Sequence, residues 1–259
     1  MLSFIRYFIF LFIATKIYSQ VSVTSDLSSN YANSQNDYNY FENLMNINVA
    51  SGNYMGWIEL EFSNPPILGL DYKGIRKLRL DYIGDITQLK IGDLYEYWGN
   101  GMILNSVDDK SIDLDTGIRG ALLTLSREQI DFSILAGNQK IMRSSNQISD
   151  YNERIPNYKS DYNLYGSRLN FIYNNFSGGI HFILANQFDK NINDVYKRNP
   201  HRLVGFNIDY FSEKLDLIFE YLSKDNNGSG LFADLTVHKE KLIFLKPVSI
   251  GLTYKNYLF

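Results

Sequence analysis

Apolar and polar residues alternate one by one along several stretches of the chain. Residues 57–62 read WIELEF, 77–82 read KLRLDY, 215–222 read LDLIFEYL and 248–255 read VSIGLTYK. Successive side chains of a β-strand point to opposite faces, so each stretch predicts a strand with one apolar and one mostly polar face. No comparable run at helical spacing is present. The pattern therefore predicts an all-β protein.

The same criterion, applied along the whole chain, predicts twelve strands with boundaries good to about two to four residues. They cover 42–50, 54–62, 76–84, 86–98, 117–126, 129–140, 162–174, 177–187, 202–212, 214–223, 231–239 and 247–255. Several are about 10 to 13 residues long, whereas strands of globular proteins usually have about 5–6. A strand that crosses a membrane needs about 9–11 residues.

Short and long connections between these strands alternate. The short connections lie at 51–53, 85, 127–128, 175–176 and 213, and the long ones at 63–75, 99–116, 141–161 and 188–201. Short turns at one end and long loops at the other are typical of outer-membrane barrels. The fold class predicted is an all-β, antiparallel, up-and-down transmembrane β-barrel of about twelve strands, with an incomplete barrel as the alternative.

The first residues resemble an export signal. Arg6 precedes a short apolar run from Tyr7 to Ala14, and Ser19 is a small residue at the expected cleavage position. The run is shorter than the roughly 20 apolar residues that span a bilayer as a helix. We therefore expect a signal peptide over 1–19, a polar lead-in over 20–41 and a barrel domain over 42–259.

The amino-acid composition argues against several classes of function. Charged residues make up 20% of the chain and the net charge is -3, whereas a nucleic-acid-binding protein usually carries a basic stripe. The chain has no Cys, which excludes disulfides, thiolate metal sites and lipidation of an N-terminal Cys. Aromatic residues reach 15%, a content that suits a membrane–water interface and also an aromatic soluble β-protein.

Alternation also places charged residues on the polar face of the predicted strands. The side chains expected to point into the barrel are Glu59, Glu61, Lys77, Arg79, Asp81 and Glu220. One strand conflicts with the pattern, because Leu89 and Ile91 share a face with Asp93. We expect either a bulge near Gly92 or a position of Asp93 beyond the lipid-facing band.

The densest group of polar residues lies between Gly92 and Gly120. Its candidate binding residues are Asp93, Glu96, Asp108, Asp109, Asp113, Asp115 and Arg119. Three explanations stay open: a bound cation, a basic ligand, or ion pairs with neighbouring strands. We favour the last, a structural network that fixes a loop folded into the barrel, because barrels of this size are often filled or plugged.

The motifs of catalysis and metal binding are incomplete. Asp113 and Asp115 lack the rest of a calcium loop, and Gly99-Asn100-Gly101 predicts a turn at the top of a strand. His181, His201 and His238 stand alone, at no metal-ligand spacing. We expect no catalytic residue, no metal and no cofactor. Residues 146–159 are expected to form a surface loop.

The segment GDLYEYWGNG (92–101), followed by IDLDTGIRG (112–120), resembles uncharacterised outer-membrane β-barrel proteins of Bacteroidota-like Gram-negative bacteria. In that family an aromatic GD…YE…G-x-G segment precedes an acidic loop and a strand that begins with RG, here Arg119-Gly120. The resemblance implies the fold and the outer membrane, and no activity. Family members tend to be longer, so it also implies a short or truncated member.

The function expected from the sequence is that of a non-enzymatic outer-membrane barrel, either a structural or binding barrel or a narrow pore with a charged, plugged lumen. Its expected partners are outer-membrane lipid, the barrel-assembly machinery and an unidentified small solute or extracellular ligand, with no nucleic acid. Two alternatives stay open: a barrel-type outer-membrane hydrolase, and a secreted soluble β-protein that binds surface glycans or partners.

Overall fold

The computed structural model describes most of the chain after the first twenty residues. The described ranges are 21–33, 39–66, 71–112, 114–144, 156–190, 196–225, 228–239 and 248–258. The expected signal peptide, Asp113 and most of the expected surface loop at 146–159 lie outside them. Within these ranges, no helix is long and apolar enough to cross a membrane.

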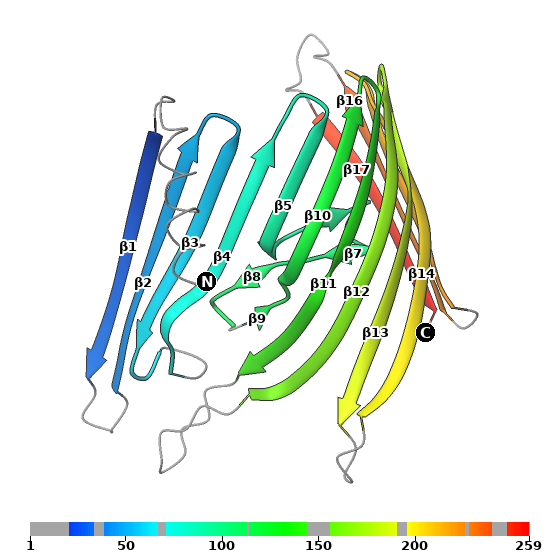
Figure 1. Ribbon diagram of the computed structural model, residues 1–259. Coiled ribbons are helices and arrows are strands. Elements are labelled where there is room, and N and C mark those ends of the chain that lie inside the picture. Colours follow the sequence, from blue (N-terminus) through cyan, green and yellow to red (C-terminus); the bar gives the residue numbers. More distant parts are fainter. Residues whose placement is uncertain are drawn as a thin grey trace, which may run out of the picture.

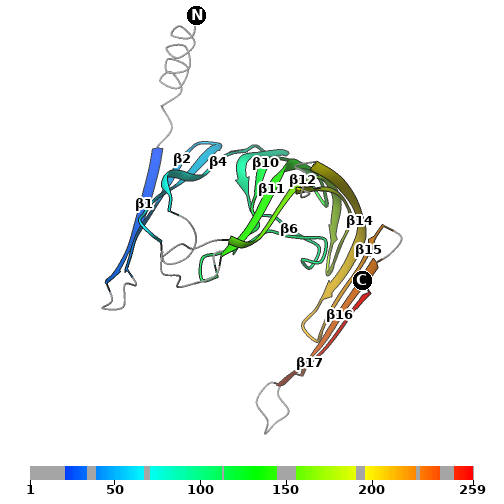
Figure 2. The same cartoon turned by 90° about the horizontal axis from the view of Figure 1, so that it is seen from below.

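Thirteen long strands follow one another in chain order and pair antiparallel into one curved sheet (Figures 1 and 2). They are β1 (Val21–Asn33), β2 (Asn39–Ser51), β3 (Tyr54–Ser63), β4 (Lys73–Ile83), β5 (Thr87–Leu94), β10 (Ile118–Arg127), β11 (Ile130–Ser144), β12 (Pro156–Tyr173), β13 (Phe176–Lys190), β14 (Tyr196–Phe211), β15 (Leu215–Lys224), β16 (Gly228–Lys239) and β17 (Val248–Leu258). The predicted antiparallel up-and-down architecture is confirmed. All twelve predicted strands are present.

The thirteenth strand is β1. The prediction of a polar lead-in at 20–41 was wrong, because this part of the chain contains a strand. Residues 21–33 pair along their whole length with β2. Val23, Leu27 and Tyr31 lie on one face of β1, opposite Val49, Met45 and Phe41. The prediction failed because Ser, Thr, Asp and Asn fill the intervening positions, so the overall composition resembled that of a disordered segment.

The strand predicted over 86–98 is also corrected, since β5 ends at Leu94 and the chain then leaves the sheet. Gly92 has a φ of 121°, and a Cβ there would lie 2.0 Å from the carbonyl oxygen of Leu78. The pairing of β5 with β10 continues without a register shift through Asp93 opposite Arg119. Asp93 therefore lies on the same face as Leu89 and Ile91, and no bulge shifts its register relative to β10.

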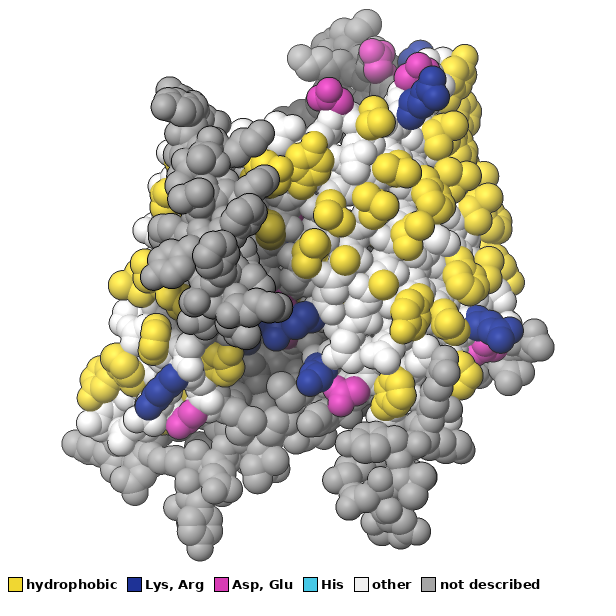
Figure 3. All heavy atoms as spheres, in the orientation of Figure 1, with side chains coloured by type: hydrophobic (Ala, Val, Ile, Leu, Met, Phe, Trp, Pro, Cys, Tyr) yellow, Lys and Arg dark blue, Asp and Glu magenta, His cyan; other side chains and the backbone are white. Residues whose placement is uncertain are grey.

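The two faces of the sheet differ in polarity. Large hydrophobic side chains remain exposed on the convex face, among them Leu80, Ile91, Leu125, Phe132, Ile134, Leu169, Ile180, Phe182, Val204, Phe206, Ile208, Val237 and Leu252. Figure 3 looks onto this face, and most of the charged side chains in that view lie toward its upper and lower margins. The concave face carries the charged residues expected there, and Glu59, Glu61, Lys77, Asp81 and Glu220 are all buried.

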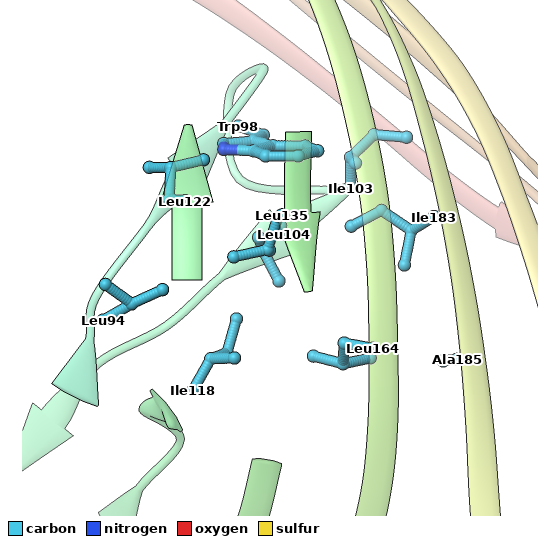
Figure 4. Packing of buried hydrophobic residues seen from close by; sticks show 10 residues of the cluster. All are labelled: Leu94, Trp98, Ile103, Leu104, Ile118, Leu122, Leu135, Leu164, Ile183 and Ala185. Carbon is cyan, nitrogen blue, oxygen red and sulfur yellow. The ribbon is translucent and has the colours of Figure 1, made fainter. Parts of the chain in front are cut away.

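A small hydrophobic core lies on the concave side, beneath β10–β13. The segment between β5 and β10 folds back against these strands, so the long connection at 99–116 fills the concave side of the sheet (Figure 2). The core residues are Leu94, Trp98, Ile103, Leu104, Ile118, Leu122, Leu135, Leu164, Ile183 and Ala185 (Figure 4). The core thus joins the folded-in segment to the wall.

The sheet has two free edges in the part of the chain that the structure describes. β1 pairs with β2 and β17 pairs with β16, and no pairing joins β1 to β17. Because consecutive strands are antiparallel and the strands on this path number thirteen, β1 and β17 run in the same direction.

Candidate functional site: two hairpins inside the curved sheet

The chain between β5 and β10 forms two small hairpins. In the first hairpin (residues 96–106), β6 (Tyr97–Trp98) pairs with β7 (Leu104–Asn105), and the Ser106 N–H donates to the Glu96 carbonyl at 2.9 Å. In the second hairpin (residues 107–116), β8 (Asp108–Asp109) pairs with β9 (Leu114–Asp115). The expected loop folded into the barrel therefore has regular structure of its own.

Apolar contacts anchor the first hairpin in recesses of the wall. Trp98 is fully buried, and a Cβ on Gly166 of β12 would lie 2.9 Å from its ring. The Arg168 guanidinium lies 5.2 Å from the centre of the same ring. Ile103 enters a second recess, since a Cβ on Gly205 of β14 would lie 2.5 Å from its Cδ1. Glycine at these two positions provides the space for the large side chains.

The tip of the first hairpin wraps a buried carboxylate. The Asn100 N–H donates to Glu220 Oε2 at 2.7 Å, and the Asn100 side chain donates to Asp209 Oδ1 at 3.3 Å. Gly99 has a φ of 62°, and a Cβ there would lie 2.4 Å from Glu220 Oε1. The Gly-Asn-Gly turn is confirmed. As predicted, the turn follows directly on a strand, here the short strand β6, and it lies against β14 and β15.

Ion pairs fix the second hairpin to β3 and β4. Lys77 Nζ lies 2.5 Å from Asp108 Oδ2 and 3.1 Å from Asp115 Oδ2. Lys110 Nζ lies 2.8 Å from Glu59 Oε2, so the hairpin also contributes a base. Lys77 and Glu59 are buried, whereas the side chain of Lys110 is 39% exposed.

Tyr95 connects this ionic cluster to the start of the segment. Its hydroxyl donates to the Asp115 carboxylate, at 3.0 Å from each oxygen, and Lys77 Nζ lies 5.0 Å from the centre of its ring. Burial raises the pKa of Tyr95 above its ordinary value, and the negative charges of Asp115 and Asp108 raise it further. Tyr95 therefore remains a neutral donor.

Asp93 and Arg119 form a separate staple on the other face. Arg119 Nε lies 2.9 Å from Asp93 Oδ1, and the second Asp93 oxygen accepts the Leu78 N–H at 2.7 Å. Arg119 also donates to the Arg76 carbonyl at 3.1 Å. The pairing of β4 with β5 ends at Arg79. The Asp93–Arg119 pair thus supplies hydrogen bonds between β4 and its neighbours where the pairing of β4 with β5 ends.

The structure brings together only part of the predicted cluster. Asp108 and Asp115 share Lys77, whereas Glu96 pairs with Lys90 at 2.8 Å and Asp109 accepts hydrogen bonds from Ser111. A ligand-binding role for these residues stays a prediction. Sequence reasoning missed the contributions of Tyr95, Trp98 and the two wall glycines, because no local motif marks them.

The three histidines lie on three different strands. His181 Nε2 is 2.8 Å from the Asn207 amide oxygen, His201 Nε2 is 3.4 Å from the Gln187 amide oxygen, and His238 Nε2 is 2.7 Å from Asp216 Oδ2. Among the described residues, no three His, Asp or Glu side chains are grouped so that they could hold a metal ion.

Solved structures with a similar arrangement of strands are outer-membrane proteins and a porin. A porin is 7% identical, with a TM-score of 0.44, and the match covers 92% of this chain and 95% of that one. The in-vitro folded trimer form of OmpT, an outer membrane protein of Vibrio cholerae, is 10% identical with a TM-score of 0.41, over 92% of this chain and 89% of that one. OccK11 of Pseudomonas aeruginosa is 11% identical with a TM-score of 0.33, and the match covers 85% of this chain and 73% of that one.

Comparison with curated proteins gave no match. A family of unknown function, DUF6029, matches residues 8–150, which is more than half of the chain and includes both hairpins. The chain belongs to this family of unknown function, DUF6029.

Proposed function

We propose that the protein forms the wall of an outer-membrane β-barrel whose lumen is plugged by its own two hairpins. The observation that carries this proposal is the inverted polarity of the sheet. Charged residues such as Glu59, Lys77 and Glu220 are buried on the concave face, while Ile134, Ile180 and Leu252 are among many large apolar side chains exposed on the convex face. A lipid-facing barrel requires this distribution.

Aromatic pairs at the short-turn end of the strands support a membrane boundary there. The rings of Tyr54 and Tyr82 lie 5.3 Å apart, and those of Phe176 and Tyr210 lie 4.7 Å apart. All four residues lie within a few positions of the short turns at 52–53, 84–86, 174–175 and 212–214. Aromatic rings with polar tips favour the interface between lipid and water.

The hairpins support a non-enzymatic role. Their charged groups pair with wall residues, and the first hairpin fills the space beneath β10–β13 with apolar side chains. We propose a structural or binding barrel, or a narrow pore, for an unidentified solute. The chain would be exported by its signal peptide and inserted by the barrel-assembly machinery. The resemblance drawn from the sequence suggests a Bacteroidota-like host.

A barrel wall must also be closed, because unpaired backbone groups are costly in hydrocarbon. β1 and β17 run in the same direction, so pairing them with each other would be parallel. Antiparallel closure requires an odd number of further strands between these two edges. We propose that other polypeptide segments supply them.

The experiment uses the absence of Cys, since single cysteines can be introduced without removing any. Nitroxide labels at Leu125, Ile134 and Ile180 are compared with labels at the turn residues Asn53 and Glu128, in protein reconstituted into vesicles. We expect the first three labels to be accessible to oxygen and shielded from a polar nickel reagent, because they face hydrocarbon. We expect the reverse for the two turns.

A soluble protein that binds glycans would give nickel accessibility at all five positions, which would refute the membrane proposal. A barrel-type hydrolase is tested separately by replacing His181, His201 and His238 one at a time. Lipase activity in the parent protein that disappears in one of these variants would overturn the non-enzymatic assignment.

A further inference from the structure

The two hairpins are attached to the wall by different forces. The first hairpin buries Trp98, Ile103 and Leu104, each less than a tenth exposed. In the second hairpin, Val107 and Ile112 are 41% and 37% exposed, and Leu114 is half-buried. Burial of apolar side chains therefore anchors the first hairpin, whereas ion pairs and hydrogen bonds hold the second.

We propose that the second hairpin is a gate for the lumen, held shut against β3 and β4 by a lock centred on Lys77. This inference rests on the proposed membrane barrel and adds its regulation. The first hairpin stays docked as a fixed plug. Release of the second hairpin opens a path along β3 and β4 for small hydrated solutes.

Lys77 is the centre of the lock because it is a buried base shared by carboxylates of both partners. Asp108 and Asp115 approach it from the hairpin, and Glu59 Oε1 lies 3.8 Å away on the wall. Without the ammonium group, the two hairpin carboxylates would lose the base that they share, while Glu59 would keep its ion pair with Lys110 at 2.8 Å. Removing one partner of a buried ion pair is strongly destabilising, because it leaves an uncompensated charge.

The other side of the hairpin provides a pivot. Leu114 and Asp115 of β9 pair with Arg143 and Met142 of β11, and the Gln139 side chain donates to the Thr116 carbonyl at 2.5 Å. These contacts join the hairpin to β11, across from the lock. We therefore expect the hairpin to swing away from β3 and β4 about β9.

The matched variants are Lys77→Met and Lys90→Met. Lys90 pairs with Glu96 of the first hairpin at 2.8 Å, so the control removes a similar ion pair from the segment that apolar contacts anchor. A nitroxide at position 111, introduced by Ser111→Cys on the exposed turn of the second hairpin, reports its motion. Trp98 reports on the first hairpin once Trp57→Phe has removed the only other Trp.

For Lys77→Met we expect the ratio of mobile to immobile label to rise by about a hundredfold, as the loss of a buried ion pair implies. Trp98 fluorescence should not change. Lys90→Met should leave the label immobile. A label that stays immobile in Lys77→Met would overturn the gate.

Neutralising the hairpin side gives a second route if Lys77→Met folds poorly. Asp108→Asn with Asp115→Asn removes the attraction while leaving Lys77 in place, and we again expect a mobile label. Lipid accessibility of the label at Ile134 is recorded in every variant. If that label is not lipid-accessible, the proposed membrane barrel fails. If it is and the hairpin stays docked, the gate alone fails.

Discussion

Gly166 and Gly205 are the residues of the sheet against which the first hairpin packs. A Cβ at either position would lie within 3.0 Å of the Trp98 ring or the Ile103 side chain. Such contacts are too short for real side chains, and an indole ring fixed by its neighbours has little freedom to move. Close packing therefore makes these two glycines part of the plug site, although neither carries a functional group.

We expect Gly166→Ala to destabilise the docked first hairpin by about 1–3 kcal/mol, the usual cost of overpacking. The measurement is urea unfolding in detergent micelles, followed by the emission of Trp98 in a Trp57→Phe background. Gly56→Ala is the control, since a Cβ at Gly56 would meet nothing within 4 Å. Equal midpoints for the two variants would contradict the steric argument.

Tyr95 predicts a pH dependence of the second hairpin. Its pKa is raised in the docked state, mainly by burial and then by Asp115. The docked hairpin is therefore fully stabilised below the ordinary tyrosine pKa of about 10 and loses stability as the pH rises above it, because Tyr95 gives up its proton more easily once the hairpin is released. Tyr95→Phe should remove this loss.

The mobility of a label at position 111 is measured between pH 8 and pH 11 in both proteins. The parent should show growing mobility above pH 10, and Tyr95→Phe should show a smaller change. Other tyrosines titrate in both proteins, so the difference between them isolates Tyr95. Identical mobility curves for the two proteins would show that ionisation of Tyr95 does not affect docking of the second hairpin.

At the scale of elements, the strands and the plug hairpins follow different rules. Each wall strand pairs with its neighbours in the chain, and the alternation of its residues defines its two faces. The first hairpin has only four residues in β6 and β7, too few to be stable alone. Its stability depends on Trp98 and on the Glu220 carboxylate at its tip.

Trp98→Ala should therefore release the first hairpin as a unit. Truncating a fully buried tryptophan typically costs about 3–5 kcal/mol, more than the pairing of β6 with β7 can replace. Limited proteolysis of the reconstituted protein should cut within 96–106 in this variant. Tyr97→Ala is the control, because Tyr97 is adjacent and 57% exposed. Equal resistance of both variants would show that other contacts hold the hairpin.

At the scale of the whole molecule, the sheet places its apolar residues where a soluble protein places charges. Ile134 lies on the outward track of β11 together with Phe132 and Ala136, and β10 contributes Leu123 and Leu125 beside them. The concave face holds the buried charges and the plug. This arrangement is stable only if the convex face meets lipid or another apolar surface.

Ile134→Arg tests this arrangement directly. A charge near the middle of a lipid-facing strand costs about 2–4 kcal/mol, whereas an exposed surface substitution usually changes stability by less than about 0.5 kcal/mol. We expect a lower fraction of folded protein in vesicles, measured by urea titration of Trp fluorescence. Asn53→Arg, on an exposed turn, should behave like the parent. If Ile134→Arg leaves the stability unchanged, the convex face is exposed to water and not to lipid.

The sequence by itself determined the strands, their order and the polarity of the two faces. This information is local, because alternation with a period of two specifies a strand and short turns pair it with the next. The sequence pattern failed at β1, where polar residues masked the alternation, and at β5, where the chain leaves the sheet after Leu94. It also indicated that the acidic segment folds inward.

Only the tertiary structure decided which residues meet inside the curve of the sheet. Asn100 contacts Asp209 and Glu220, which are 109 and 120 positions away, and no local pattern records such contacts. The division of the acidic cluster between the ion pairs of Lys77 and the outward Asp93–Arg119 pair depends on the register of β4, β5 and β10. A single-position change of register moves a side chain to the other face, so the final pairing alone could separate the two groups.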